Sequence, residues 1–387
     1  MSKNIILSIV IPTLNRYETL LPLLRALCNF GDDNFEIIIQ DNSSENKPFI
    51  DYYNYNFDSR IKYFHSNRKL SAIENCDLAV SQANGTYISF IGDDDGVSEK
   101  IIQCCVWMKE NNVDSVFFNR AIYTWPGTNH FFKLNNFSNG KLIINKITGS
   151  VLRLDVKDEY LKIIKSGGQS MYNAPRVYHG IVKKECLDHL YADLGTYFPG
   201  PVPDMSNCIA LTKYVNNHFY IDLPLIITGQ SSKSMSGLNA NRKHQGEINS
   251  QKTLPGTTAD KWYSKIPFYW SGPTIWAQAA IEASSCIGVD ALEKFNFAKL
   301  YAFCFAFTSK MYYSRVFKLI LSEKNVFNKC KLSFLVMFYL LQISFVRFRI
   351  LFLKLIGNED QLSFSDIEHV ISHVNLLVKE KSIKLKI

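Results

Sequence analysis

Short apolar runs alternate with segments of helical periodicity over the first hundred residues. The run Ile5–Ile11 is apolar except for one serine, as expected of a strand buried on both faces. Residues 17–30 then place leucines at the spacing of one helical face. Further strands are expected at 35–40, at 61–64 and just before Gly92, and a further helix at 71–83. Strands that alternate with helices predict a mostly parallel sheet with helices on its faces.

Each of these predicted strands ends in a polar loop. The four loops are Pro12–Arg16, Asp41–Ser44, Asn67–Ser71 and Asp93–Asp95. Because the carboxyl ends of parallel strands meet at one edge of a sheet, the four loops are expected to converge there. Ligands of such sheets bind at that edge, so the pattern predicts a binding site built by all four loops.

Three consecutive carboxylates, Asp93, Asp94 and Asp95, form the last of these loops. Such a cluster repels itself unless a positive group holds it. A hard divalent cation is one such partner, since it prefers carboxylate oxygens and keeps open positions for substrate phosphates. An acidic surface turn is the alternative, and the three neighbouring loops favour the metal site.

Other phosphate-binding signatures need glycines at fixed positions, because the backbone must approach the phosphate closely. No G-x-G-x-x-G follows the first strand and no G-x-x-x-x-G-K-[ST] occurs, which argues against a dinucleotide-dependent oxidoreductase and a P-loop nucleotidase. The first loop, Pro12–Arg16, also has no glycine, although a nucleotidylyltransferase would want a glycine-rich loop there.

Four segments together resemble family 2 glycosyltransferases of the GT-A fold. They are Ser8–Asn15, Glu36–Ser44, Asn75 with Ala79, and Ala83–Asp95, and the resemblance is strong over residues 5–100 and weak beyond them. The resemblance implies a Rossmann-like, mixed and mostly parallel sheet, a nucleotide-sugar donor, transfer with inversion, and a divalent cofactor, Mn²⁺ or Mg²⁺. The usual family motif is Asp-x-Asp-Asp, whereas this chain has Gly92 at the first position.

The resemblance also assigns roles to single residues of the donor site. Asp94 and Asp95 are the expected metal ligands. The expected contacts to the donor nucleotide are Pro12, Thr13, Asn15, Arg16, Asp41, Lys69 and Asp93.

Asp204 is the expected general base, since the family places a carboxylate about a hundred residues after the metal motif. It follows Pro203 in a loop rich in proline and glycine, directly before a predicted helix. An aspartate in this position is also a common helix N-cap, and the two roles are compatible. Three further side chains are expected to contact acceptor or phosphate, with a structural or solvated role as the alternative: His179, Arg242 and His244.

The net charge of +8 is concentrated near the C-terminus. Residues 297–356 hold ten Lys and Arg against the single acid Glu323, and they are rich in Phe and Leu. The longest uncharged run has 15 residues, which is short of the roughly 20 that a spanning helix needs. The pattern predicts helices lying at a membrane surface, with a packed helical domain as the alternative. The apolar density argues against nucleic acid as a partner.

These observations divide the 387 residues into three regions. Residues 1–230 are expected to form the catalytic domain, with the nucleotide-sugar part at 1–100 and the acceptor part at 101–230. Residues 231–260 are expected to be a flexible loop, and 261–387 a mainly helical, basic region. Nine scattered cysteines without C-x-x-C and the lack of a secretory pattern at the start predict a reducing, cytoplasmic location.

The sequence thus predicts an enzyme at the cytoplasmic face of the inner membrane. It would extend a saccharide acceptor, lipid-linked, in the synthesis of bacterial surface polysaccharide. Two alternatives stay open: a binding protein that keeps the fold without turnover, and a nucleotidylyltransferase with a similar sheet.

Overall fold

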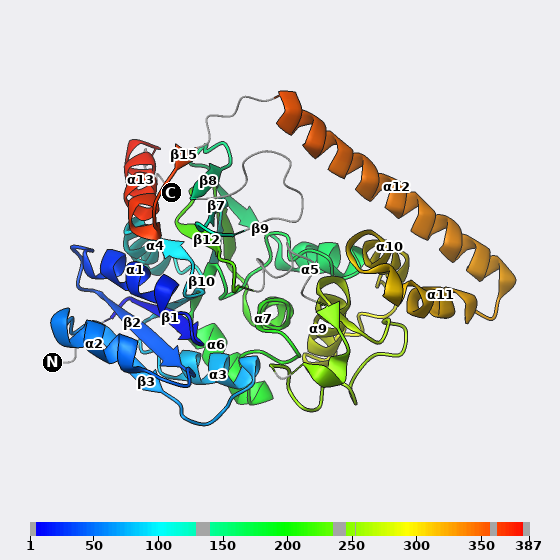
Figure 1. The fold of residues 1–387 in the computed structure, drawn as a ribbon, viewed down its shortest axis with the longest axis horizontal. Helices are drawn as coiled ribbons and strands as arrows, with labels where there is room; N and C mark the ends of the chain where they lie inside the picture. The colour runs from blue at the N-terminus through cyan, green and yellow to red at the C-terminus, as the bar shows by residue number, and fades with distance from the viewer. Residues whose placement is uncertain (1–4, 129–139, 235–244, 252, 357–361, 382–387) are drawn as a thin grey trace.

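The computed structural model describes residues 5–128, 140–234, 245–251, 253–356 and 362–381 (Figure 1). The strands are β1 (Leu7–Thr13), β2 (Phe35–Asp41), β3 (Ile61–His65), β4 (Tyr87–Phe90), β5 (Gly96–Val97), β6 (Ser115–Phe118), β7 (Ala121–Thr124), β8 (Lys141–Ile144), β9 (Val151–Leu154), β10 (Gly180–Lys183), β11 (His218–Ile221), β12 (Ile226–Gln230), β13 (Gln245–Gly246), β14 (Trp270–Ser271) and β15 (Leu362–Ser363). The α-helices are α1 (Tyr17–Cys28), α2 (Lys47–Tyr55), α3 (Ala72–Ser81), α4 (Lys100–Glu110), α5 (Val156–Lys165), α6 (Lys184–Leu194), α7 (Pro203–Tyr214), α9 (Gly272–Cys286), α10 (Phe297–Phe307), α11 (Tyr313–Leu321), α12 (Val326–Ile356) and α13 (Ile367–Lys381).

An eight-stranded sheet in the order β3-β2-β1-β4-β10-β6-β11-β9 forms the centre of the molecule. The first four strands of this order run parallel, β10 runs antiparallel to both β4 and β6, and β11 is again parallel to β6. β1 and β2 are buried almost throughout, as their continuous apolar runs predicted. The predicted mixed, mostly parallel α/β sheet is confirmed.

A second sheet, in the order β15-β8-β7-β12-β5, lies beside the acidic motif. β12 pairs with β5, the two-residue strand that follows the three aspartates. Gly229 in β12 has no room for a side chain, since a Cβ atom there would lie 1.7 Å from the backbone oxygen of Asp94. The second sheet therefore packs directly against the backbone of the acidic motif and holds it in position.

Two apolar cores cover the two faces of the central sheet. One includes side chains of α1, α4 and α13, and the other includes side chains of α3, α7, α9 and α10. α3 begins with a capping box, in which Ser71 accepts from the Glu74 N–H while Glu74 accepts from the Ser71 N–H. This cap starts the helix directly after the third polar loop, as the sequence indicated.

The C-terminal region is mainly helical, as predicted, and its last helix returns to the N-terminal half. α9 to α12 extend to one side of the molecule, whereas α13 packs beside α1 and β5 (Figure 1). Asn375 of α13 accepts from the Ser98 hydroxyl at 2.7 Å, and Arg25 of α1 pairs with Glu368 at 2.8 Å. Residues 261–387 therefore contribute to two separate parts of the structure.

Candidate active site

Asp41, at the carboxyl end of β2, is fully buried and held by three groups of the chain itself. One oxygen accepts from the Tyr17 hydroxyl at 2.5 Å and the Tyr63 hydroxyl at 2.7 Å, and the other accepts from the Ser43 N–H at 2.7 Å. Burial, together with the hydrogen bond to Asp41, raises the pKa of Tyr17 to about 12. Both tyrosines, which the sequence analysis did not single out, therefore orient this carboxylate.

The other polar loops meet beside Asp41. Asn15 has a left-handed backbone (φ 55°), and its side-chain oxygen accepts from the Ser44 N–H at 3.2 Å. Asn42 donates to the carbonyls of Ser66 and Arg68 and so ties the third loop to the second. Lys69 is exposed on this third loop, and Pro12 lies within β1.

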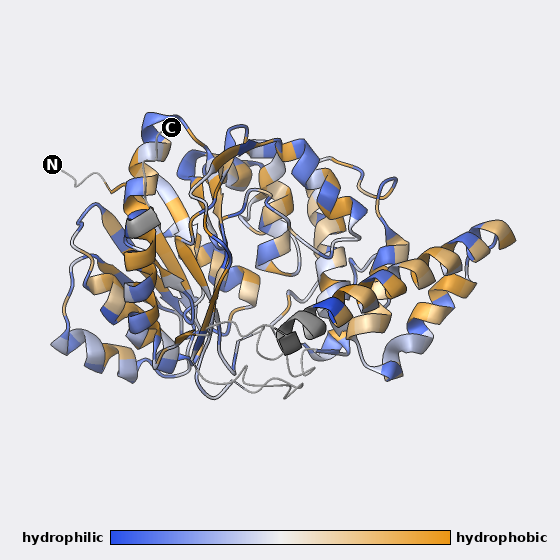
Figure 2. Cartoon of the chain, turned by 90° about the horizontal axis from the view of Figure 1, so that it is seen from above, coloured by the Kyte–Doolittle hydropathy of each residue, from blue (hydrophilic) through white to orange (hydrophobic). Residues whose placement is uncertain are grey.

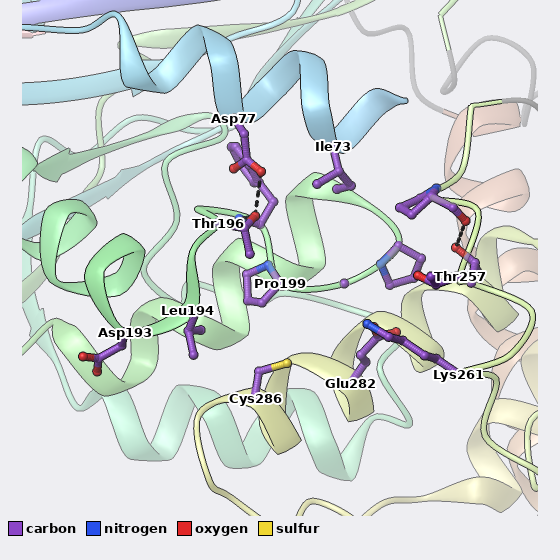
Figure 3. Close-up of a pocket in the computed structure, with 15 residues that line it drawn as sticks. Ile73, Asp77, Asp193, Leu194, Thr196, Pro199, Thr257, Lys261, Glu282 and Cys286 are labelled. Atoms are coloured by element: carbon purple, nitrogen blue, oxygen red, sulfur yellow. Dashed lines mark hydrogen bonds and ion pairs between the residues drawn. The ribbon is translucent and has the colours of Figure 1, made fainter. Parts of the chain in front are cut away.

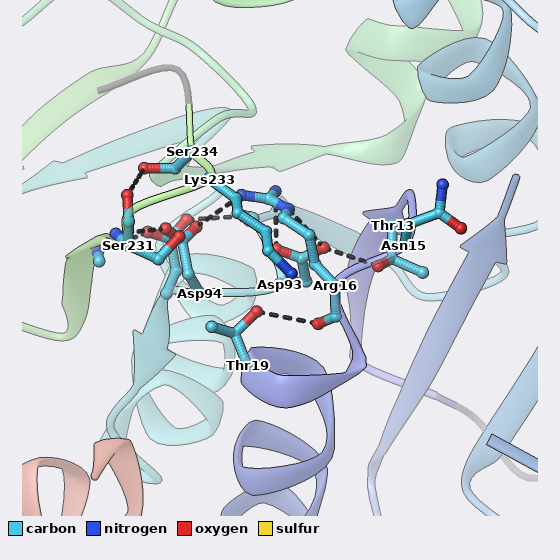
Figure 4. A network of polar contacts seen from close by, with 12 residues as sticks. Thr13, Asn15, Arg16, Thr19, Asp93, Asp94, Ser231, Lys233 and Ser234 are labelled. Atoms are coloured by element: carbon cyan, nitrogen blue, oxygen red, sulfur yellow. Dashed lines mark hydrogen bonds and ion pairs between the residues drawn. The ribbon is translucent and has the colours of Figure 1, made fainter. Parts of the chain in front are cut away.

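Asp93 is enclosed by residues of the first loop. Thr13 donates its hydroxyl to one carboxylate oxygen at 2.6 Å, and the Arg16 guanidinium lies 2.6 Å from the other (Figure 4). Arg16 also lies 3.7 Å from an oxygen of Asp94. One guanidinium therefore offsets the charge of two adjacent carboxylates.

The other two aspartates are fixed by backbone and histidine. Asp94 accepts from the Ser231 N–H at 3.0 Å, and its own carbonyl accepts from the Trp125 indole at 2.7 Å. Asp95 accepts from the Gly229 N–H at 2.7 Å and contacts His179 Nε2 at 2.7 Å. All three aspartates are buried, so the acidic surface turn considered from the sequence is excluded.

Burial dominates the electrostatics of the cluster. It raises the pKa of Asp93 to about 7, although the Arg16 guanidinium acts to lower it. Burial and the charge of Asp95 raise the pKa of Asp94. The cluster therefore holds its negative charge against a desolvation cost, which an approaching cation reduces.

Asp94 is the aspartate best placed to hold a divalent ion. The oxygens of Asp93 are taken by Thr13 and Arg16, whereas one oxygen of Asp94 has only the Arg16 guanidinium, at 3.7 Å. No group of three or more His, Cys, Asp or Glu side chains able to hold a metal ion occurs within the described residues. This donor set fits a Mg²⁺-type site, in which one or two carboxylates bind and substrate phosphates complete the coordination.

His179 joins the acidic cluster to the acceptor side. Its backbone is left-handed (φ 60°), which is uncommon for a residue other than glycine, and its ring stacks on Tyr178 at 4.1 Å. Its N–H donates to the carbonyl of Phe90, the last residue of β4. The strained turn therefore holds the imidazole against Asp95.

Asp204 lies in the first turn of α7, which begins at Pro203. The N-cap is Val202, so Asp204 does not cap the helix, although it accepts from the Met205 N–H at 2.8 Å. Burial raises the pKa of Asp204, while the charges of Arg176 and His179 act to lower it. Burial and the charges of Asp95, Asp94 and Asp204 raise the pKa of Tyr178, so its hydroxyl interacts electrostatically with both the acidic cluster and Asp204.

Asn207, which the sequence analysis missed, links α7 to the turn that carries His179. Its side-chain oxygen accepts from the Val177 N–H at 2.9 Å, and its amide donates to the Tyr197 carbonyl at 3.0 Å. Both bonds are buried. One amide therefore sets the distance between the helix of Asp204 and the end of β4.

A cavity of about 440 Å³ lies on the other side of the loop before α7, between α3 and α9 (Figure 3). Asp77 on its wall accepts from the Thr196 hydroxyl and the Tyr197 N–H, and Lys261 pairs with Glu282. None of the predicted site residues lines it.

The predicted loop 231–260 is described in part. Ser231 binds Asp94, and β13 and a short 3₁₀ helix at Ile248–Ser250 follow later. The predicted contacts Arg242 and His244 lie outside the described residues.

Comparisons with known proteins match parts of the chain. Residues 8–172 match the model of Glycosyl transferase family 2. A GalNAc(5)-diNAcBac-PP-undecaprenol beta-1,3-glucosyltransferase of Campylobacter jejuni is 34% identical over 118 residues, which are 30% of this chain and 38% of that relative. Glycosyltransferase GlyG of Streptococcus pneumoniae is 27% identical over 129 residues, 33% of this chain and 43% of that relative. The chain thus spans about two fifths of the length of these curated relatives.

Two solved structures are also similar. TarS 1–349 of S. aureus in complex with UDP has a TM-score of 0.43 at 14% identity, covering 62% of this chain and 64% of that one. Mannosyltransferase PcManGT of Pyrobaculum calidifontis, in complex with GDP-Man and Mn²⁺, has a TM-score of 0.38 at 12% identity, covering 85% and 84%. At these TM-scores the two likenesses support no statement about the site. The match over residues 8–172 includes the acidic motif and its three neighbouring loops, and this segment of the chain is therefore similar to Glycosyl transferase family 2.

Proposed function

We propose that this chain transfers a sugar from a nucleoside-diphosphate sugar to an acceptor hydroxyl, with inversion at the anomeric carbon. The observation that carries the proposal is the buried acidic cluster, in which Arg16 pairs with Asp93 and His179 contacts Asp95, while the charge of His179 also acts on the buried Asp204. The family match over residues 8–172 supports the same reaction class.

The acceptor half of the reaction belongs to Asp204. Its carboxylate takes the proton of the acceptor hydroxyl as that oxygen forms a bond to the anomeric carbon. The bond from this carbon to the donor phosphate breaks, and its electron pair leaves with the nucleoside diphosphate. The Met205 N–H holds one oxygen of Asp204, so the carboxylate is oriented before the substrate binds.

The donor half needs positive charge beside the leaving diphosphate. Arg16 is the cation of the chain nearest to the acidic cluster among the ion pairs of the described residues. A divalent ion, Mn²⁺ or Mg²⁺, fits beside Asp94 and, when bound, would neutralise the diphosphate. Asp95 is the predicted second ligand. For this role, one of its oxygens would have to bind the ion while the Gly229 N–H continues to donate to the carboxylate.

The acceptor is proposed to be lipid-linked and presented at the cytoplasmic face of the inner membrane. The name of the Campylobacter relative includes an undecaprenol-linked diphosphate saccharide, which supports this choice for a chain with an exposed apolar, basic region. Synthesis of a surface polysaccharide is the matching role.

Calorimetric binding of UDP, GDP, CDP and dTDP, with and without Mn²⁺ or Mg²⁺, tests the donor site. One diphosphate is expected to bind with metal, and Asp94→Asn should remove the metal dependence while Asp51→Asn, an exposed control on α2, should not. Binding that ignores both metal and Asp94 would contradict the proposal.

Turnover separates the remaining alternatives. With the matching nucleotide sugar, Asp204→Asn should lower the transfer rate by about 10²–10⁴-fold while donor binding stays unchanged. Intact donor after long incubation with many acceptors would favour a binding protein. Release of pyrophosphate from a nucleoside triphosphate and a sugar phosphate would instead indicate a nucleotidylyltransferase.

A further inference from the structure

Helix α12 has two apolar faces, of which the fold uses one. The inner face packs on α10 through side chains such as Leu335, Val336, Tyr339 and Ile343. These positions recur at the three- and four-residue spacing of a single helical face. They give α12 its place in the fold and leave large apolar side chains of the opposite face exposed.

The outer face of α12 is a stripe of large apolar side chains in solvent. Its members, called the outer stripe below, are Phe334, Met337, Phe338, Leu341 and Phe345. Phe334 is 69% exposed and Phe345 is 67% exposed. Figure 2 shows α11 and α12 as a largely hydrophobic pair of helices that project away from the sheet. A contiguous apolar surface of this kind marks an interaction site in a soluble protein.

Basic residues border the outer stripe along one edge. At about 100° per residue, Lys331 and Arg349 lie along this edge. Arg347 lies on the α10 side of the helix instead, where its guanidinium is 4.8 Å from the centroid of the Phe307 ring. Lysine and arginine stems can cover apolar surface while the charged ends reach an anionic layer.

α12 is long enough to cross a bilayer, but the fold rules this out. Val326–Arg349 has 24 residues and a mean hydropathy of 1.5. Its N-terminal end is tied to α10 and α11, and five residues after Ile356 the chain re-enters the sheet as β15, which pairs with β8. Five residues reach roughly 20 Å, less than the roughly 30 Å of a hydrocarbon core, so both ends of α12 lie on one side.

We propose that α12 lies flat in the interface of an anionic lipid bilayer, with the outer stripe among the acyl chains and the basic border at the headgroups. The lipid surface is favoured over a second copy of this chain because two such stripes would bring their basic borders together. Exposed Phe317 and Leu321 of α11 continue the apolar surface.

Lipid binding by α12 would bring the proposed enzyme to its membrane. It depends on the proposed function only for this biological role, since binding to lipid needs no glycosyl transfer. Because α13 and β15 dock the chain back on the catalytic domain, the helix is held at both ends. The active site therefore keeps one orientation relative to the bilayer.

Vesicle flotation of the full chain tests the inference. Wild-type protein should float with phosphatidylglycerol-containing vesicles, less with pure phosphatidylcholine, and less at high salt. Phe334→Gln with Phe345→Gln should weaken binding about tenfold or more, because each aromatic ring loses its apolar burial. The matched control, Tyr55→Gln with Phe57→Gln, changes two exposed aromatic residues at the end of α2 and should bind as wild type.

Three results would overturn the inference. In the first, wild-type protein binds neither kind of vesicle. In the second, the Phe334→Gln/Phe345→Gln variant floats like wild type. In the third, wild type binds no vesicles and is a dimer in light scattering, whereas the variant is a monomer. Transfer to a soluble acceptor should be unchanged in the variant. If wild type transfers no sugar but binds vesicles as expected, the proposed function falls and the lipid-binding helix stands.

Discussion

Replacing Asn207 with alanine should lower the free energy of unfolding by several kcal/mol and remove most of the transfer rate. Asn207→Ala removes two buried hydrogen bonds, one to the Val177 N–H at 2.9 Å and one to the Tyr197 carbonyl at 3.0 Å. An unsatisfied buried polar group costs about 1–3 kcal/mol, so the two together give about 2–6 kcal/mol. For 387 residues this corresponds to a loss of about 2–7 °C in Tm.

The catalytic effect of the same change follows from what the two bonds connect. Val177 precedes the turn that holds His179 against Asp95, and Asn207 is on the helix that begins beside Asp204. Without the two hydrogen bonds, the turn of His179 and the helix of Asp204 are free to move apart, which separates the predicted base from the acidic cluster. The transfer rate should therefore fall while the affinity for the nucleoside diphosphate changes little. Thermal denaturation, calorimetry and initial rates measure the three quantities.

A matched control and a clear contrary result are available. Asn111→Ala removes one hydrogen bond, to the Trp107 carbonyl, at an exposed helix end, and should change stability by less than about 0.5 kcal/mol. If Asn207→Ala also stays within this range and keeps its rate, then the two bonds do not hold the site together and the reasoning is wrong.

Three further changes probe the site. Gly229→Ala should lower soluble yield and Tm, because its Cβ atom would lie 1.7 Å from the backbone oxygen of Asp94. Arg16→Met leaves the buried Asp93 carboxylate without its ion pair and should cost about 3–5 kcal/mol in thermal or urea unfolding; an unchanged midpoint would refute the pairing. The pH profile of transfer should have an acid limb above the ordinary range of an aspartate, because burial raises the pKa of Asp204 and the base works only when deprotonated. Asp204→Asn should remove that limb.

The first hundred residues were predictable because their signals are local. The expected strands 35–40 and 61–64 match β2 and β3 within one residue, and the helix expected at 17–30 is α1, Tyr17–Cys28. Continuous apolar runs and leucine spacing depend only on neighbours in the chain. The convergence of the four loops then followed from the geometry of a parallel sheet.

The contacts that set the electrostatics of the site were not predictable in this way. The Tyr63 hydroxyl reaches Asp41 across 22 positions, and the Arg16 guanidinium reaches Asp93 across 77. Nothing in the sequence around Tyr63 distinguishes it from any other aromatic residue of an edge strand. Gly229 carried no signal either, since its requirement arises where a strand of the second sheet passes the acidic motif.

The packing of α13 connects the C-terminal helices to the part of the sheet that carries the acidic motif. Its Val374 and Val378 are buried in the same core as α1, and Asn375 accepts the Ser98 hydroxyl directly after the acidic motif and β5. A chain that merely ended in a membrane helix would let the catalytic domain tumble on a tether. Here the segment between α9 and β15 is anchored to the rest of the fold at both ends. A bilayer that binds α12 therefore also fixes the direction in which the edge of the sheet faces. If the acceptor is lipid-linked as proposed, its hydroxyl would meet the site at one height above the membrane, because the fold sets the orientation of the site before any acceptor binds.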